Sequence, residues 1–289
     1  MVHCWKSLGW RLGLVSLLGM GYAIASLGDC ARAQITPDGT LGSESSVVAP
    51  TAPGATVDVI SGGATRGANL FHSFEQFSVL TGREAFFNNA ADIQNIISRV
   101  TGSSISNIDG LLRANPSANL FLINPNGIIF GPNATLNIGG SFVGTTANAI
   151  GFGNQGFFSA SAPDAPSLLT VNPDAFFFNQ IASGSITNNS TVPAGLDPSG
   201  TARFGLRVPD GQSLLLVGGD VRLERAEGDV RLPALERAAL QALGGRIELG
   251  GLASPGSVGL SMNGSLMNLS FPDGVARADV YYDWVALCY

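Results

Sequence analysis

Residues Asn119–Phe130 read NLFLINPNGIIF, and no other stretch is as informative about the fold of the chain. Two apolar runs, Leu120–Ile123 and Ile128–Phe130, are separated by the four residues NPNG at Asn124–Gly127. Proline presets φ at the first corner of a turn, asparagine is tolerated at the next, and glycine accepts positive φ. The stretch therefore predicts a β-strand, a tight turn and a second β-strand.

Short strands and corners recur around this stretch. A second turn follows at Gly131–Asn133, and Thr135–Ile138 then alternates polar and apolar residues. The four-residue motif ANLF occurs twice, at Ala68–Phe71 and Ala118–Phe121, which predicts similar corners in successive coils. Because each short strand cannot bury its apolar face alone, it needs a neighbouring coil beneath it. The first coil would be an exposed sheet edge, so we expect residues 34 to about 77 to cap it.

Composition also indicates β structure. Charged residues are 12% of the chain, about half the usual share of roughly 25%, and there are 38 glycines. Such a composition suits strands joined by tight turns. We predict strands over 93–100, Ser213–Leu223 and Arg246–Leu249. One short helix is predicted at 233–243, where Pro233 fits a first helical position and apolar residues follow with helical spacing.

The first 33 residues have the features of an export signal. Lys6 and Arg11 precede the apolar stretch Leu12–Leu27, and Ala31-Arg32-Ala33 is a small-x-small cleavage site. The apolar stretch is shorter than the roughly 20 residues of a membrane span, which favours a cleaved signal over an uncleaved anchor. We therefore predict export without a stable membrane span.

Removal of this segment leaves 12 cations against 20 anions and no lysine. Nucleic-acid binding requires clustered cations, so the remaining chain is not expected to bind nucleic acid. It retains one histidine, His72, and one cysteine, Cys288, which excludes an intrachain disulfide. A lone histidine between aromatic residues is more typical of packing than of metal binding. We predict no cofactor and no metal site.

Two further segments contain residue patterns found at chemical sites. Gly151–Gly156 (GFGNQG) matches a dinucleotide fingerprint in letters, but no helical period follows it, so a glycine-rich corner is favoured. The densest charge lies at Asp220–Asp229. Paired carboxylates can cleave glycosidic bonds, whereas charges alternating with apolar residues more simply describe a strand with one solvated face. A polysaccharide-acting β-helical enzyme remains the alternative, with four candidate acids: Asp220, Glu224, Glu227 and Asp229.

The segment Asn124–Ile128 (NPNGI) resembles the signature of the filamentous haemagglutinin N-terminal family, the secretion (TPS) domains of two-partner secretion exoproteins. Arg99–Gly102 and Asn119–Ile123 are similar to the family's approach to that motif. The resemblance runs from residue 34 to about 280 and implies a right-handed parallel β-helix with an N-terminal β cap and short inserted elements. The residues it assigns to the secretion motif or structural turn are Asn124, Pro125, Asn126, Gly127 and Ile128, with Asn119, Leu120 and Phe121 as the supporting strand.

The resemblance also implies a function. The chain would be the secretion-targeting domain of a haemagglutinin-like exoprotein or adhesin, exported through the periplasm and then secreted or held at the cell surface. Periplasmic domains of an outer-membrane pore partner would recognise it, and it would fold outside. The second family motif, NPNL, is missing, which bears on partner recognition. A non-functional truncated remnant is a third alternative, and the sequence does not identify a host or matrix ligand.

These features predict four segments. Residues 1–33 form the signal peptide, 34–145 the cap and core of the secretion domain, and 146–280 further coils with the helical insert. Residues 281–289 form an atypical tail that holds every Tyr and Trp after the signal segment. A reading frame that departs near Asp279 and an aromatic capping strand both explain this tail.

Overall fold

The computed structural model describes residues 35–115, 117–179, 184–224 and 239–282. Within these ranges the regular structure consists of β-strands and two short 3-10 helices, η1 (Gly42–Glu44) and η2 (Gly153–Gln155). The all-β class predicted from the sequence is confirmed. The export signal predicted over residues 1–33 lies outside the described residues.

The first sheet stacks strands from successive passes of the chain. Every neighbouring pair from β5 to β24 is parallel, whereas β1 and β4 (Ala64–Arg66) are antiparallel to β5. In spatial order its main strands are β1 (Ile35–Pro37), β5 (Asn69–Phe77), β7 (Asn95–Val100), β10 (Asn119–Ile123), β13 (Phe142–Thr145), β21 (Ser213–Gly218) and β24 (Arg246–Gly251).

Two further sheets complete each pass. The second contains, in order, β27 (Val280–Tyr282), β22 (Val221–Leu223), β17 (Ile186–Asn188), β11 (Ile128–Phe130) and β8 (Ser106–Ile108), all parallel. The third contains, in order, β12 (Thr135–Asn137), β9 (Leu111–Ala114), β6 (Glu84–Phe87), β3 (Val57–Gly62) and β2 (Ser46–Pro50). The third sheet is parallel except for the β2–β3 pair.

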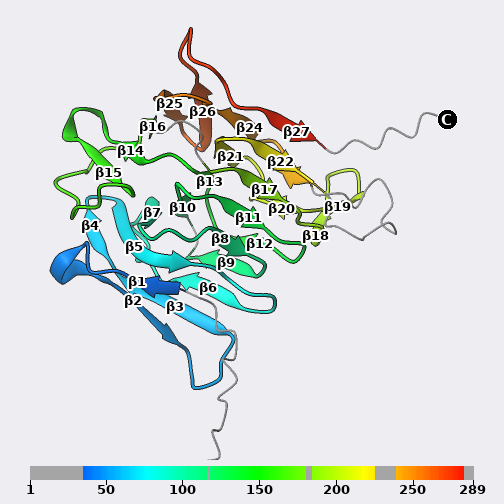
Figure 1. Cartoon of the computed structure of the whole chain (residues 1–289). Helices are drawn as coiled ribbons and strands as arrows, with labels where there is room; N and C mark the ends of the chain where they lie inside the picture. Colours follow the sequence, from blue (N-terminus) through cyan, green and yellow to red (C-terminus); the bar gives the residue numbers. More distant parts are fainter. Residues whose placement is uncertain (1–34, 116, 180–183, 225–238, 283–289) are drawn as a thin grey trace, which may run out of the picture. The chain divides into compact units, whose positions relative to one another are not determined.

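The chain visits the three sheets in a repeating order. It runs through β7, β8 and β9, then through β10, β11 and β12, and returns to the first sheet at β13 (Figure 1). Each of these two passes adds one strand to each of the three sheets, and this arrangement is compatible with a parallel β-helix.

A fourth sheet lies outside this repeat and is antiparallel throughout. Its order is β15 (Phe157–Ser159), β14 (Ala149–Gly151), β16 (Ala175–Phe178), β25 (Gly256–Asn263) and β26 (Leu266–Ser270). Two small ribbons complete the described strands: β18 (Pro193–Leu196) pairs with β19 (Ala202–Phe204), and β20 (Leu206–Arg207) pairs with β23 (Leu240–Gln241).

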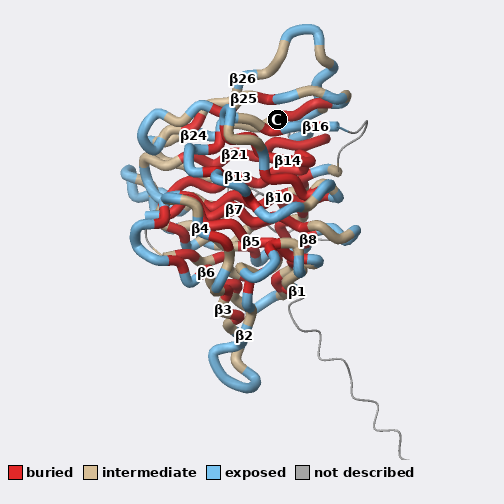
Figure 2. The backbone as a smooth tube through the Cα atoms, turned by 90° about the vertical axis from the view of Figure 1, so that its left-hand side faces the viewer, coloured by how far each residue is buried: buried red, intermediate tan, exposed pale blue. Residues whose placement is uncertain are grey.

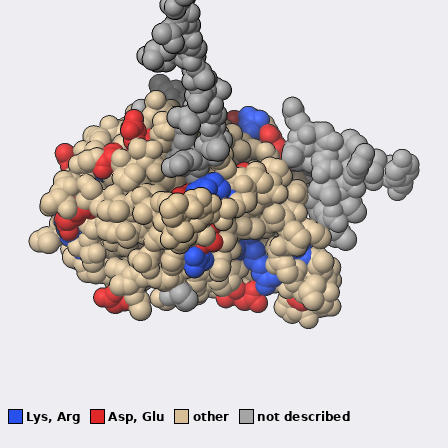
Figure 3. All heavy atoms as spheres, turned by 90° about the horizontal axis from the view of Figure 1, so that it is seen from below, with Lys and Arg blue, Asp and Glu red and all other residues tan. Residues whose placement is uncertain are grey.

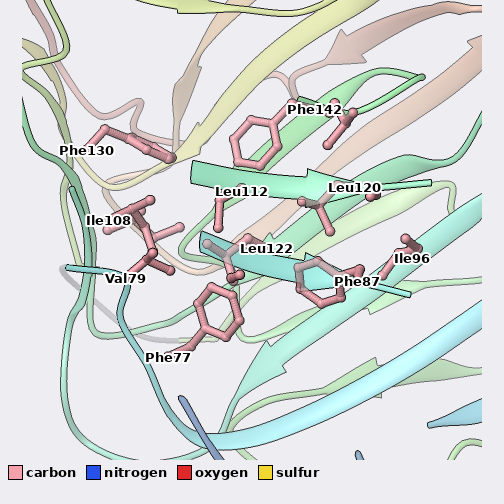
Figure 4. Packing of buried hydrophobic residues seen from close by; sticks show 14 of the residues in the cluster. Phe77, Val79, Phe87, Ile96, Ile108, Leu112, Leu120, Leu122, Phe130 and Phe142 are labelled. Atoms are coloured by element: carbon pink, nitrogen blue, oxygen red, sulfur yellow. The ribbon is translucent and has the colours of Figure 1, made fainter. Parts of the chain in front are cut away.

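Two hydrophobic cores explain the apolar run of β10. Leu120 and Leu122 point into the core between the three parallel sheets, and Figure 4 shows them among the other apolar side chains of this core. Phe121 and Ile123 point the other way, into a second core between the first and fourth sheets. A strand buried on both faces requires an uninterrupted apolar sequence rather than an alternating one. Figure 2 accordingly shows buried strands through the middle of the stack and exposed residues at the connections.

The predicted helix at 233–243 is wrong in its described part. Leu240–Gln241 is strand β23, and the Ala239 carbonyl accepts a hydrogen bond from the Leu206 amide at 3.0 Å. The apolar residues satisfy helical spacing, but pairing with the adjacent pass of the chain satisfies their backbone groups instead. Residues 233–238 lie outside the described part of the chain.

The predicted strands are present, and one of them is divided in two. Asn95–Val100 and Arg246–Gly251 are strands where strands were predicted. The single strand predicted over Ser213–Leu223 is two strands, because the chain leaves the first sheet after Gly218 and enters the second at Val221. Sequence periodicity does not mark this corner, since apolar residues fill Leu214–Val217 and return at Val221 and Leu223.

Candidate functional site

The strand–turn–strand prediction for the motif is confirmed in its geometry. The turn connects β10 in the first sheet to β11 in the second, and the Gly127 amide donates to the Asn124 carbonyl at 3.1 Å. This is the first-to-fourth hydrogen bond of a β-turn, with Pro125 at its second position. Positive φ falls on Gly127, at 131°. Glycine adopts this conformation without the steric penalty that a side chain would bring.

Asn124 is the turn residue whose side chain is buried. Its side chain is 0% exposed, and its amide nitrogen Nδ2 donates to the Ser104 carbonyl at 2.9 Å and to Ser106 Oγ at 3.0 Å. Its Oδ1 accepts the Asn126 amide at 3.0 Å, which closes a second turn through the side chain. Asn124 therefore joins the turn to the preceding pass of the chain and fixes the conformation of the turn itself.

The following pass covers the turn from the other side. The Gly184 amide donates to the Pro125 carbonyl at 3.0 Å, and the Ile128 amide donates to the Ser185 carbonyl at 3.1 Å. A Cβ on Gly184 would lie 2.3 Å from the carbonyl carbon of Asn126, so only glycine permits this approach. The turn is thus one layer in a stack of corners.

Asn126 is the exposed residue of the turn, and Pro125 is half-buried beside it. The Asn126 side chain donates through Nδ2 to the Gly102 carbonyl at 2.7 Å and to Asn124 Oδ1 at 3.0 Å. The ring of Pro125 and the outer side of Asn126 are therefore the parts of the motif that a partner protein could reach. Asn124, Gly127 and Ile128 are buried.

The predicted supporting strand begins with an asparagine ladder. Asn95 Nδ2 donates to Asn69 Oδ1 at 2.8 Å, and Asn119 Nδ2 donates to Asn95 Oδ1 at 2.9 Å. The repeated ANLF letters thus mark one column of the first sheet, with Asn95 between the two copies. Leu120 and Phe121 follow in the two cores. The strand holds the turn in register with its neighbours.

β7 carries a buried charge that was not predicted from the sequence. Arg99 is 0% exposed and donates to Ser73 Oγ at 2.9 Å, to Thr40 Oγ1 at 2.8 Å and to the Ser159 carbonyl at 2.8 Å. Its guanidinium also lies 4.0 Å from the centre of the Phe158 ring. The signal in the sequence is a single arginine in the apolar strand Asn95–Val100, where no surface face is available.

Asp38 is the acidic counterpart of this network. It accepts hydrogen bonds from the hydroxyl groups of Thr40, Ser73 and Thr101. Burial opposes ionisation of Asp38, but these hydrogen bonds outweigh it and lower the pKa of the carboxyl below its ordinary value. Burial lowers the pKa of Arg99 to about 10, with Asp38 and Asp164 acting in the opposite direction. Both groups are therefore charged at neutral pH.

The domain that contains this turn matches a known family. The model described as the TPS secretion domain matches residues 33–284. The chain belongs to the TPS secretion domain family. A search of curated proteins finds no match. The family is one of secretion-targeting domains and not a family of enzymes, and it places the chain among two-partner secretion exoproteins, which pass through the periplasm and interact with an outer-membrane partner.

The TPS domain uses its other candidate residues for structure. His72 is 1% exposed, lies 3.0 Å from Ser46 Oγ through Nδ1, and packs between Phe74 and Phe87. Burial lowers its pKa to about 3, so the ring is neutral. The packing interpretation of this histidine is confirmed. Across residues 35–115, 117–179, 184–224 and 239–282, no group of three or more His, Cys, Asp or Glu residues could hold a metal ion.

The charged segment of the TPS domain forms a partly exposed strand in its described part. Arg222, on β22, pairs with Asp220 at 3.1 Å and with Glu224 at 3.4 Å. The two carboxylates therefore both pair with one arginine. Glu227 and Asp229 lie outside the described residues. Figure 3 shows few charged side chains on the face seen from below, with single acidic and basic groups scattered over it.

The glycine-rich segment Gly151–Gly156 is a corner of the fourth sheet. It contains the end of β14 and the 3-10 helix η2 before β15 begins at Phe157. A dinucleotide fingerprint would need a long helix after its first glycine, so the corner interpretation is confirmed. Among the residues that the structure describes, none forms a helix with the length and apolar character that crossing a bilayer requires.

Proposed function

We propose that this TPS domain targets a haemagglutinin-like exoprotein to an outer-membrane pore, whose periplasmic domains recognise it before the chain folds outside the cell. The observation that carries this proposal is the family match over residues 33–284, together with the turn at Asn124–Ile128 within it. Residues 1–33 act as a cleaved signal peptide, and the mature protein is secreted or held at the cell surface. An adhesive role belongs to the same proposal.

Within this function, the chief role of the motif is to form the corner between β10 and β11. Asn124 and Gly127 are buried and make the bonds that define the turn, which supports a structural role for them. Pro125 and Asn126 are the accessible members and are the ones available to a partner. Recognition would then depend on two residues that the other three hold in place.

The strand order supports two finer features of the proposed fold. The chain forms a right-handed coil, which is the hand favoured for connections between parallel strands of one sheet. Strands β1 and β2 form the cap, because each pairs antiparallel with the first parallel strand of its sheet. Both strands cover backbone groups that would otherwise lie at a sheet edge.

Secretion with and without the pore partner tests the function. The full chain is produced in a bacterium with its pore partner, and the mature protein is measured in the medium and in the periplasm. Deletion of the pore gene should leave the protein in the periplasm. Unchanged release without the pore would exclude the proposal, and absence from the medium with the pore intact would support a non-functional remnant.

A paired variant tests the motif in the same assay. N126V/G127V should reduce secretion strongly, because β-branched side chains resist the φ of 131° found at Gly127. The matched control is Asn137→Val, on the exposed side of β12, which should be secreted normally. Equal secretion of both variants would show that the motif is not required for secretion.

A further inference from the structure

Asn126, the exposed residue of the motif turn, is hydrogen-bonded to the preceding pass of the chain, which also carries Arg99. Asn126 Nδ2 donates to the Gly102 carbonyl at 2.7 Å, and Gly102 directly follows Thr101 at the end of β7. The Thr101 amide is fixed by the Phe74 carbonyl at 2.8 Å. The Thr101 hydroxyl donates to Asp38 Oδ2 at 2.5 Å. The Asp38 carboxylate therefore holds Thr101 in place, next to Gly102, whose carbonyl bonds Asn126 of the turn.

Arg99 reaches the same carboxylate by another route. It donates to Ser73 Oγ and to Thr40 Oγ1, and both hydroxyls in turn donate to Asp38. Its third bond, to the Ser159 carbonyl, anchors the network to the fourth sheet. The positive and negative charges are thus connected through two hydroxyl groups.

Residues 35–40, which we call the N-terminal arm, contribute Asp38 and Thr40 to this network. Without the arm, Arg99 would remain buried with its main counter-charge removed. The Thr101 hydroxyl would keep only its longer bond to the Phe74 carbonyl, at 3.2 Å. Leaving one member of a buried ionic network without its partner is strongly unfavourable. The strand end at Thr101–Gly102 would then shift towards solvent to relieve that cost, and Gly102 is the support of Asn126.

We propose that docking of the N-terminal arm positions the Asn124–Ile128 turn through Arg99 and Thr101. Arg99 and Thr101 are positioning residues in this scheme, since neither forms part of the motif. The consequence for partner recognition rests on the proposed function: Pro125 and Asn126 are presented correctly when the first residues of the mature chain are in place. The physical coupling itself can be measured without any pore partner.

Hydrogen exchange of the purified mature chain, followed by mass spectrometry of its peptides, tests the coupling. In Asp38→Ala, amides of residues 101–106 and of residues 124 and 126–128 should exchange about tenfold faster, because loss of a part-buried hydrogen bond to a carboxylate changes local opening by this order. Amides of β21 and β24 should keep their rates. The control is Glu44→Ala. This substitution removes the ion pair between Glu44 and Arg66 close to the arm, and Glu44 itself does not bond Thr101.

A second variant keeps the test decisive if Asp38→Ala unfolds. Thr101→Val removes the hydroxyl that bonds Asp38 and keeps the shape of the side chain, so it should accelerate exchange at residues 124–128. Thr101→Ser retains the hydroxyl and should restore the slow rate, which a role in packing alone would not produce. The proposal is overturned if Thr101→Val leaves residues 124–128 unchanged, or if exchange rises equally throughout the chain. Loss of secretion with unchanged exchange would instead concern the pore interaction.

Discussion

Asn124 shows how one side chain can define a corner. Its amide nitrogen bonds the preceding pass, and its oxygen bonds the turn that follows. Asn126, two residues on, is exposed and bonds the Gly102 carbonyl. The two asparagines of NPNG are equivalent as letters, but burial makes their energetic roles different, because an unpaired buried group costs more than an exposed one.

Asn124→Ala should therefore destabilise the domain by about 2–4 kcal/mol, because it leaves the Ser104 carbonyl and the Asn126 amide without partners. Urea unfolding followed by circular dichroism measures the loss. Asn126→Ala is the matched control and should cost less, about 1 kcal/mol or below, since water can replace its bonds. Equal losses would contradict the assignment of Asn124 as the structural member.

His72 makes a pH-dependent contribution to stability. Its folded pKa of about 3 lies below the unfolded value of 6.5, so the unfolded chain binds the proton first. The contribution is complete above pH 6.5 and is lost as the pH falls towards 3. Between pH 6 and 5, where unperturbed carboxyl groups remain mostly ionised, the free energy of unfolding should fall by up to about 1.4 kcal/mol per pH unit.

Denaturant unfolding at a series of pH values measures this slope. His72→Gln cannot titrate and should show almost no slope between pH 6 and 5, although it is less stable overall. The carboxyl groups of Asp38 and Glu44 have lowered pKa values and contribute below this window. A slope that persists in the variant would assign the effect to another group.

Among the elements, the strands of the first sheet are joined by side chains as well as by backbone bonds. Asn69, Asn95 and Asn119 form a ladder at the same end of β5, β7 and β10. Since a shift of one residue would turn every side chain to the opposite face, such a ladder fixes the register of the stacked strands. The two buried faces of the sheet add to this constraint.

Asn95→Ala should cost about 2–4 kcal/mol, because Asn95 is 0% exposed and bonds both neighbouring asparagines. Thermal and urea unfolding give the value. Asn137→Ala, on the exposed side of β12, offers the comparison and should change stability by no more than about 0.5 kcal/mol. A small effect at Asn95 would show that backbone pairing alone sets the register.

In the whole described domain, the first sheet lies between two cores. One core fills the space between the three parallel sheets, and the other lies beneath the fourth sheet. The fourth sheet consists of segments that leave the repeating path after β13 and after β24. It covers apolar side chains such as Phe121 that a simple stack would expose to water, so both cores contribute to stability.

Substitutions on the two faces of β10 test this arrangement. Leu120→Ala should cost about 2–5 kcal/mol and Phe121→Ala about 3–5 kcal/mol, because each leaves a cavity in a different core. Chemical unfolding measures both. If Phe121→Ala were nearly neutral, the fourth sheet would not pack against the first as described.

The amino-acid sequence alone specifies the β class, the strand–turn–strand at Asn119–Phe130 and the need for neighbouring coils, because turn residues and short apolar runs act locally. It also singled out Asn124–Ile128. Tertiary structure decided that Leu120 and Phe121 enter different cores and that Leu240–Gln241 is a strand rather than part of a helix. It also decided that the buried Arg99 is linked to the half-buried Asp38 through Thr40 and Ser73. These outcomes depend on contacts between residues distant in sequence, and local patterns carry no information about which partner a distant strand supplies.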